Sequence, residues 1–216
     1  TGVLLPPAEL EPIISLAQKH GFYVIFDECY ELIFYEEGPY SAAPYRGENV
    51  IVVGSLSKSH AVPGWRLGWA LGPKGVIQAA TAAQSHSVTH PSTLSQRAAL
   101  AALTEGWDAT TPMRAEYRAR RDLVVEGLKA IPGVECLPPE GAFYAFPDVS
   151  AFFGGDSVAL ASYLLDEAHV ATVPGRAFGR DGHLRLSFSC SREELAAGLA
   201  RLKEALEALA RKGSLK

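Results

Sequence analysis

The residues best suited to chemistry lie in a turn that follows a short apolar run. Lys58 belongs to segment 54–59, which is rich in glycine and serine, and Arg66 follows it closely. A lysine in such a turn either binds phosphate or forms a Schiff base with a carbonyl. The P-loop pattern, a glycine-rich loop ending in Gly-Lys and then Ser or Thr, is absent from the sequence. A surface lysine near an ion-paired arginine is the simpler alternative.

Three short apolar runs must position these residues. They are residues 22–26, 50–53 and 67–71; Asp27 follows the first directly, and Ser55 follows the second. Continuous apolar runs of this length, alternating with helical patterns, are typical of strands in a parallel sheet covered by helices. Polar residues just past the carboxyl ends of such strands tend to form the ligand site. We therefore expect Asp27, Ser55 and Lys58 at one edge of the sheet.

Helical patterns connect these runs and continue after them. One helix is expected from Pro6-Pro7 to Gly21, because glycine suits the left-handed position after a helix end. The middle of the chain predicts two further helices, and the last third alternates as a separate α+β layer. The expected elements are helices at 93–103, 113–130 and 158–169, strands at 141–146, 170–173 and 184–188, and a last helix that begins at Ser191, where Glu194 completes a capping box.

Composition excludes several classes of protein. The 216 residues are 48% hydrophobic and 20% charged, which argues against intrinsic disorder, and the net charge of −4 argues against a nucleic-acid partner. No apolar run of about 18 residues is present, so no membrane association is expected. The three cysteines form no CxxC pair, which favours a reducing, cytoplasmic location. His86 and His90 lack the HExxH pattern, so no metal site is expected.

The order of several short motifs resembles the class I and II aminotransferases, which are fold-type I pyridoxal-phosphate enzymes. Segment 55–58 (Ser-Leu-Ser-Lys) with 64–68 (Gly-Trp-Arg-Leu-Gly) is similar to the cofactor-lysine signature of that family. Segment 27–30 (Asp-Glu-Cys-Tyr) resembles its upstream D-x-x-Y motif. Three further similar motifs follow in the family's order. They are Gly141–Tyr144, Val173–Gly175 with Phe178-Gly179, and Leu184–Ser187.

This resemblance implies an α/β fold and a reaction. Residues 1–111 would be the C-terminal part of the large fold-type I domain, whose mostly parallel sheet is incomplete here, and residues 112–216 a small α+β domain. The implied reaction moves an amino group between an L-amino acid and a 2-oxo acid, with pyridoxal 5′-phosphate bound to Lys58 as a Schiff base. Amino-acid metabolism and a homodimer, when the polypeptide is full length, are also implied.

The resemblance assigns catalytic roles to three residues. Lys58 would hold the cofactor, be displaced by the substrate amine, and then carry the proton between the substrate Cα and the cofactor. Asp27 would keep the pyridine nitrogen protonated, so that the ring accepts electrons. Tyr30 would donate its hydroxyl to the phenolic oxygen of the cofactor. The structural alternatives are a strand-end carboxylate that caps a helix for Asp27 and a packed ring for Tyr30.

The resemblance also assigns binding roles. Ser55, Ser57 and Arg66 would bind the cofactor phosphate, although Ser57 also suits a purely turn-forming role. Arg185 would bind the substrate α-carboxylate with its two-pronged guanidinium. An inward-facing arginine between two leucines is costly to bury unpaired, which favours a function for Arg185. For Arg176, which follows Pro174-Gly175, a solvated side chain is favoured over a place at the mouth of the site.

Two rival functions share these residues. A carbon–sulfur β-lyase on the same scaffold would use the same lysine, aspartate, tyrosine and arginines. An aminotransferase-like sensing domain of a transcription regulator would also keep the scaffold and would need a helix-turn-helix segment upstream. The identity of the amino acid and of the oxo acid is not encoded in these motifs.

The start of the chain resembles the end of a family motif. Thr1-Gly2 is similar to the tail of the N-P-T-G signature. We therefore expect this chain to be the C-terminal part of a longer polypeptide, with the glycine-rich phosphate loop and the ring-stacking aromatic encoded elsewhere. By itself the chain is expected to be inactive, because sheet edges and apolar faces would lack partners.

Overall fold

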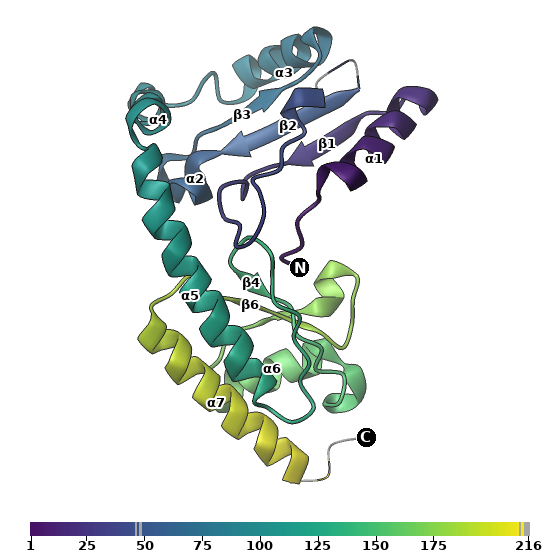
Figure 1. Ribbon diagram of the computed structural model, residues 1–216, viewed down its shortest axis with the longest axis vertical. Coiled ribbons are helices and arrows are strands. Elements are labelled where there is room, and N and C mark those ends of the chain that lie inside the picture. Colours follow the sequence, from purple (N-terminus) through teal and green to yellow (C-terminus); the bar gives the residue numbers. More distant parts are fainter. Residues whose placement is uncertain (46, 48, 212, 214–216) are drawn as a thin grey trace. The chain divides into compact units, whose positions relative to one another are not determined.

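The computed structural model describes residues 1–45, 47, 49–211 and 213. They form two compact units, called here the N-terminal unit (residues 4–114) and the C-terminal unit (residues 1–3 and 115–216). Each unit contains a three-stranded sheet with its own helices (Figure 1). No helix among the described residues has the length and apolar character that a bilayer crossing requires.

The sheet of the N-terminal unit has the order β1-β2-β3. Strands β1 (Val24–Asp27) and β2 (Val50–Ser55) are parallel, as predicted for the first two apolar runs, and both arrows point the same way in Figure 1. Strand β3 (Gly68–Leu71) is antiparallel to β2. The reversal arises in the connection, where α2 (Leu56–Ser59) and the short 3-10 helix η2 (Pro63–Trp65) turn the chain back.

Helix α1 (Pro7–His20) covers one face of this sheet. Leu10 and Ile14 are buried against Val50 and Val52 of β2, in a cluster that also contains Ala42. The helix ends at Gly21, whose φ of 70° is left-handed and whose N–H donates to the Ala17 carbonyl, as predicted.

The remaining helices of the N-terminal unit are more exposed. Helix α4 (Thr93–Glu105) agrees with its prediction, but α3 (Lys74–Ser87) was not predicted. Its sequence is rich in alanine and polar residues, and none of its residues is buried, so no apolar stripe marks it. Short 3-10 helices η1 (Ala43–Tyr45) and η3 (Trp107–Ala109) complete the unit, and α5 (Thr110–Lys129) begins in it and continues into the next.

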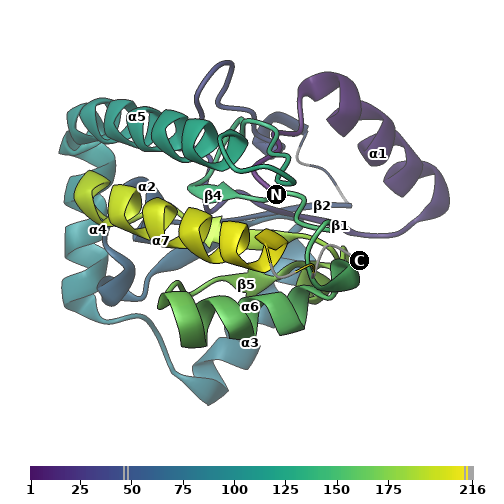
Figure 2. The same cartoon turned by 90° about the horizontal axis from the view of Figure 1, so that it is seen from below.

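The C-terminal unit is an antiparallel sheet with helices packed on it. Its strand order is β4-β6-β5, with β4 (Tyr144–Ala145), β5 (Val173–Pro174) and β6 (Leu184–Ser187). The first two strands are shorter than the predicted runs. Helices α6 (Ser157–Ala168) and α7 (Arg192–Arg211) pack together and lie side by side in Figure 2. The 3-10 helices η4 (Phe153–Gly155) and η5 (Gly175–Phe178) shape the loops.

The core of the C-terminal unit is closely packed. Helix α7 begins with the predicted capping box: Glu194 N–H donates to Ser191 Oγ at 3.2 Å, and Ser191 N–H donates to Glu194 Oε2 at 3.0 Å. Helix α7 packs on α6 and buries Leu195, Leu202, Leu206 and Leu209. The side chains that are at most 2% exposed include Phe152, Leu160, Leu164, Leu184, Phe188, Leu202 and Leu206.

Candidate active site

Two strand ends in the N-terminal unit meet at one edge of the sheet. Asp27 ends β1 and lies opposite Val53 of β2 in parallel register, and Glu28 N–H donates to the Val53 carbonyl at 2.8 Å. Ser55 ends β2, and α2 follows directly, at the tip of the β2 arrow in Figure 1. Register and strand direction therefore bring Asp27 and the 55–58 turn to the same edge, as the sequence predicted.

Two serine hydroxyls lie together in the lysine turn. Ser55 is the N-cap of α2: its Oγ accepts a hydrogen bond from Ser57 N–H at 3.0 Å and lies 2.8 Å from Ser57 Oγ. Ser55 Oγ also lies 3.0 Å from the Leu67 carbonyl oxygen, which joins the turn to the segment before β3. Lys58 follows in the only turn of α2 and is half-buried.

The charges of Asp27 and Lys58 both act on the Cys29 thiol. Cys29 N–H donates to Asp27 Oδ1 at 3.1 Å. Burial, together with the hydrogen bond and charge of Asp27, raises the pKa of the Cys29 thiol to about 11, and the positive charge of Lys58 opposes this rise. The Cys29 thiol therefore stays protonated near neutral pH, which argues against a nucleophilic role.

The segment that carries Tyr30 is tied to the core by a residue that the sequence did not single out. Tyr30 is half-buried, and its carbonyl accepts a hydrogen bond from Ile33 N–H at 2.9 Å. The Glu28 carboxylate accepts hydrogen bonds from Ser41 Oγ at 2.7 Å and from the N–H of buried Ala42 at 2.6 Å. Glu28 thus closes the loop after Tyr30. Its only sequence signal was its place within the 27–30 motif.

Arg66 is exposed and is oriented by its backbone. It has a left-handed φ of 53°, at the end of η2, and its Nη1 donates to the Pro63 carbonyl at 3.0 Å. The glycines around it reflect close backbone approach. A Cβ at Gly68 would lie 2.7 Å from the Gly54 carbonyl oxygen, and a Cβ at Gly54 would lie 2.6 Å from the Trp69 ring.

Arg185 belongs to the C-terminal unit, where two aromatic rings enclose it. It is half-buried on β6, and its guanidinium carbon lies 4.4 Å from the ring centroids of both Tyr144 and Phe178. Within the described part of the C-terminal unit, no hydrogen-bond acceptor is paired with this guanidinium. With the two rings packed against this guanidinium, its N–H groups suit a planar anion such as a carboxylate. The sequence did not predict this ring pair, although both rings belong to motifs singled out there.

Arg176, by contrast, is already paired. Its Nε and Nη2 donate to Asp181 Oδ2 at 2.8 and 2.6 Å, and Nη2 lies 3.4 Å from Asp156 Oδ1. These contacts explain its exposed position without a ligand.

The donor set of the strand edge indicates what this site can bind. A lysine amine suits a carbonyl group, the Asp27 carboxylate suits a protonated ring nitrogen, and the two serine hydroxyls suit a phosphate. This set fits a phosphorylated aldehyde that carries a basic ring. Among the residues that the structure describes, no group of three or more His, Cys, Asp or Glu side chains is arranged to hold a metal ion.

The known proteins that are similar to this chain are aminotransferases. The family model for aminotransferase class I and II matches residues 1–202. An aspartate aminotransferase of Streptomyces avermitilis is 40% identical over 95% of this chain and 53% of that protein. An aspartate/prephenate aminotransferase of Thermus thermophilus is 43% identical over 95% of this chain and 54% of that protein. The crystal structure of an aromatic aminotransferase from Pyrococcus horikoshii OT3 superimposes with a TM-score of 0.91 at 36% identity, covering 99% of this chain and 58% of that one.

These matches cover a larger share of this chain than of its relatives. The chain spans about half the length of the curated relatives it matches. The names of the relatives differ in substrate, from aspartate to prephenate to aromatic compounds. The similarity therefore includes both compact units, but it is shared by proteins of different specificity.

Proposed function

This chain belongs to the class I and II aminotransferase family, and we propose that it supplies the cofactor-binding lysine and the carboxylate-binding arginine of a pyridoxal-phosphate-dependent aminotransferase. The observation that carries the proposal is the meeting of Asp27, the Ser55–Ser57 hydroxyl pair and Lys58 at one sheet edge. Pyridoxal 5′-phosphate, when bound, supplies an aldehyde for the lysine amine and a ring that accepts the electrons released at the substrate Cα.

Each residue of the chain has a separate task in this proposal. Lys58 would hold the cofactor through its amine and would move the proton at the substrate Cα. Asp27 would keep the ring nitrogen protonated, and Tyr30 would donate its hydroxyl to the phenolic oxygen of the cofactor. The phosphate of the cofactor would be bound by Ser55, Ser57 and Arg66.

Arg185 orients the substrate. Its N–H edge binds the carboxylate next to the reacting carbon, and the rings of Tyr144 and Phe178 limit the directions that this edge can take. The proposed substrates are α-amino acids and 2-oxo acids with a free carboxylate at that position.

Covalent trapping tests the proposal most directly. The longest gene product that contains this sequence is incubated with pyridoxal 5′-phosphate, reduced with borohydride and mapped by peptide mass. We expect the adduct on the peptide that contains Lys58, its loss in Lys58→Ala, and its retention in Lys74→Ala, which removes an exposed lysine of the same unit. An adduct that survives in Lys58→Ala would contradict the proposal.

A second measurement separates amino transfer from elimination. Amino transfer consumes the donor only when a 2-oxo acid accepts the amino group, whereas a β-lyase releases ammonia and a 2-oxo acid without an acceptor. We expect turnover of L-aspartate to depend on added 2-oxoglutarate, and ammonia release from cystathionine in the absence of an acceptor would support the lyase.

The proposal extends to organisation and location. Residues 1–111 are proposed as the C-terminal part of the cofactor domain and residues 112–216 as the small domain, and the compact units that meet in α5 support this division. A homodimer is proposed for the complete enzyme. A cytoplasmic location is proposed because Cys29, Cys136 and Cys190 are free thiols, as is usual in a reducing compartment.

A further inference from the structure

The ring pair around Arg185 depends on a loop. Tyr144 belongs to β4, but Phe178 is the last residue of η5, is 43% exposed, and lies in the loop between β5 and β6. Beyond Arg185, its ring contacts the edge of Phe146, with centroids 6.0 Å apart. An exposed ring on a loop stays over a guanidinium only if the loop itself is fixed, because a free loop would sample other positions.

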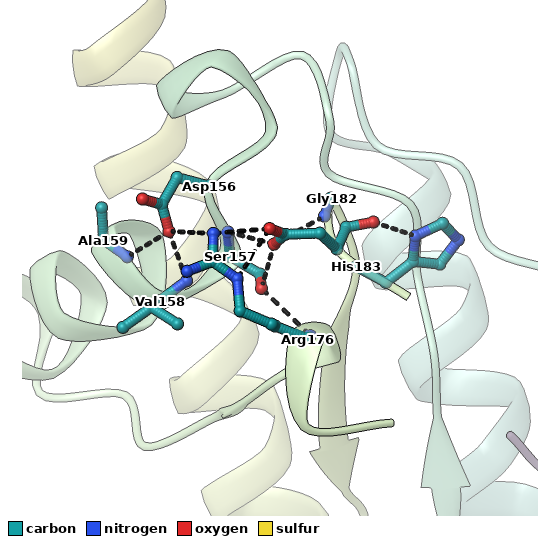
Figure 3. A network of polar contacts seen from close by, with 8 residues as sticks. Asp156, Ser157, Val158, Ala159, Arg176, Gly182 and His183 are labelled. Carbon is teal, nitrogen blue, oxygen red and sulfur yellow. Dashed lines mark hydrogen bonds and ion pairs between the residues drawn. The ribbon is translucent and has the colours of Figure 1, made fainter. Parts of the chain in front are cut away.

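A carboxylate inside the loop fixes it to the start of α6. Asp181 Oδ1 accepts hydrogen bonds from Ser157 Oγ at 2.6 Å, Ser157 N–H at 2.9 Å and Gly182 N–H at 3.1 Å. Asp181 Oδ2 accepts both hydrogen bonds from Arg176, and Arg176 N–H donates to Ser157 Oγ at 3.2 Å. We call Ser157, Arg176 and Asp181 the loop brace; Figure 3 shows Ser157 and Arg176 within this network.

The anchor of the brace, Ser157, lies in a buried helix start. Ser157 is 1% exposed, and the neighbouring Asp156 caps α6 by accepting from Val158 N–H at 3.0 Å and Ala159 N–H at 3.1 Å. The hydrogen bonds from Ser157, and then that from Arg176, hold the pKa of the Asp181 carboxyl well below its usual range. Asp181 is therefore ionised throughout the neutral range, and the brace is a charge-assisted network.

Backbone hydrogen bonds also close the loop. Gly175 N–H donates to the His183 carbonyl at 2.7 Å, and Arg180 N–H donates back to the Gly175 carbonyl at 3.0 Å. A Cβ at Gly175 would collide with the carbonyl oxygens of Arg180 and His183. The brace and these hydrogen bonds hold the loop on both sides of Phe178: Arg176 lies two residues before it, and Gly179, directly after it, donates its N–H to the Arg176 carbonyl at 3.1 Å.

We propose that Asp181 is a positioning residue for carboxylate binding: through Arg176 it holds Phe178 over the guanidinium of Arg185 and so fixes the direction of the Arg185 N–H edge. The inference rests on the proposed role of Arg185 and deepens it. Asp181 touches no substrate; its effect passes through the loop. A merely structural role would lower stability without changing how substrate binds.

The kinetic test compares variants of the longest gene product that contains this sequence, with L-aspartate and 2-oxoglutarate as substrates. Asp181→Asn removes the charge and weakens the fork with Arg176. We expect the KM of both substrates to rise about tenfold, because both carry the same carboxylate, while kcat changes little. Glu207→Gln is the matched control, since Glu207 is a partly exposed carboxylate on α7 whose ion pairs with Lys203 and Arg211 are 3.9 Å long.

Phe178→Leu provides a second route to the same result. It removes the ring from Arg185 and leaves every brace contact in place, so a folding defect in the brace cannot account for its effect. We expect the same rise in KM, and the double variant should show no further rise, because both changes act on one element. Additive effects would overturn the inference.

Amide hydrogen exchange gives a readout that needs no turnover. We expect the N–H groups of Gly175, Gly179 and Arg180 to exchange faster in Asp181→Asn and to be unchanged in Glu207→Gln. Normal KM values in Asp181→Asn, beside raised values in Arg185→Lys, would overturn this inference and leave the proposed function intact. Unchanged KM values in Arg185→Lys would contradict the proposed function itself.

Discussion

The two compact units position their functional side chains in different ways. In the N-terminal unit, strand register and a short helical turn place Asp27, Ser55 and Lys58, and Arg66 is oriented by one hydrogen bond to a backbone carbonyl. In the C-terminal unit, Arg185 is enclosed by two rings, one of them on a loop that a carboxylate network ties down.

The two units also differ in how completely they bury apolar side chains. Ile25 on β1 is 64% exposed and Leu94 on α4 is 76% exposed, whereas Phe152 and Phe188 of the C-terminal unit are at most 1% exposed. The C-terminal unit therefore has a core that can stabilise its own site. The N-terminal unit aligns its functional groups with much less buried surface, and its stability is expected to be lower.

The first prediction concerns a buried leucine in the core of the C-terminal unit. Leu164 of α6 is fully buried, so Leu164→Ala should cost about 3 kcal/mol through lost burial and the cavity left behind. Its neighbour Leu165 is 53% exposed, and Leu165→Ala should change stability by less than about 0.5 kcal/mol. Denaturant unfolding followed by far-UV circular dichroism measures both.

Tryptophan fluorescence sharpens this test. All three tryptophans, Trp65, Trp69 and Trp107, belong to the N-terminal unit, so their fluorescence reports on that unit alone. We expect Leu164→Ala to shift the dichroism transition more than the fluorescence transition. Equal shifts in both signals would mean that the units unfold together, and the comparison drawn above would be wrong.

The second prediction concerns a tightly packed glycine in the sheet of the N-terminal unit. A Cβ at Gly54 would lie 2.6 Å from the Trp69 ring, so Gly54→Ala should overpack the centre of the sheet and cost about 2 kcal/mol. The fluorescence transition should shift to lower denaturant more than the dichroism transition does, because the clash involves a tryptophan of this unit. Gly64→Ala is the control, since a Cβ there would meet no atom within 4 Å. A neutral Gly54→Ala would show that β2 and β3 have room to separate.

Much of this architecture could be predicted from the sequence, and the exceptions have physical reasons. Apolar runs that end in polar residues predicted the parallel pair β1 and β2 and the strand edge with Asp27 and Ser55, because strand direction fixes which ends meet. The capping box at Ser191 is a local pattern and was confirmed atom by atom. The direction of β3 depends on how the chain turns after Lys58, and no residue pattern encodes that.

Contacts between distant residues could not be predicted. Ser157 and Asp181 meet through the tertiary fold, and neither belongs to a periodic pattern that indicates a partner. The rings of Tyr144 and Phe178 were visible as parts of motifs, but their packing against Arg185 follows from strand pairing and from the loop. The roles of Lys58, Asp27, Tyr30, Ser57 and Arg66 stay predictions that the proposed experiments test.

The third prediction concerns the start of α7. Ser191→Ala removes the side-chain acceptor of the capping box and should lower stability by about 1 kcal/mol. Ser191→Thr keeps a hydroxyl at the cap and should retain most of the stability. Dichroism should record the change, because α7 belongs to the C-terminal unit. An equal loss in both variants would attribute the effect to packing of the serine rather than to the cap.

The smallest effect is expected at the surface, between α5 and α7. Glu116 accepts hydrogen bonds from Arg192 Nη2 at 2.5 Å and Arg120 Nε at 2.8 Å, and these partners, Arg192 first, lower the pKa of its carboxyl to about 2. Because the folded state lowers this pKa below the unfolded value of 4.5, the pair stabilises the unit above that pH, and the contribution disappears as the pH falls towards 2. Glu116 is exposed enough for salt to screen the pair, so the effect at neutral pH is small. We expect Glu116→Gln to be less stable than the original chain at pH values above the unfolded pKa and equal to it in strong acid, with Glu207→Gln as control. A stability difference that persists unchanged in strong acid would mean that Glu116 acts through packing of α5 on α7 and not through its charge.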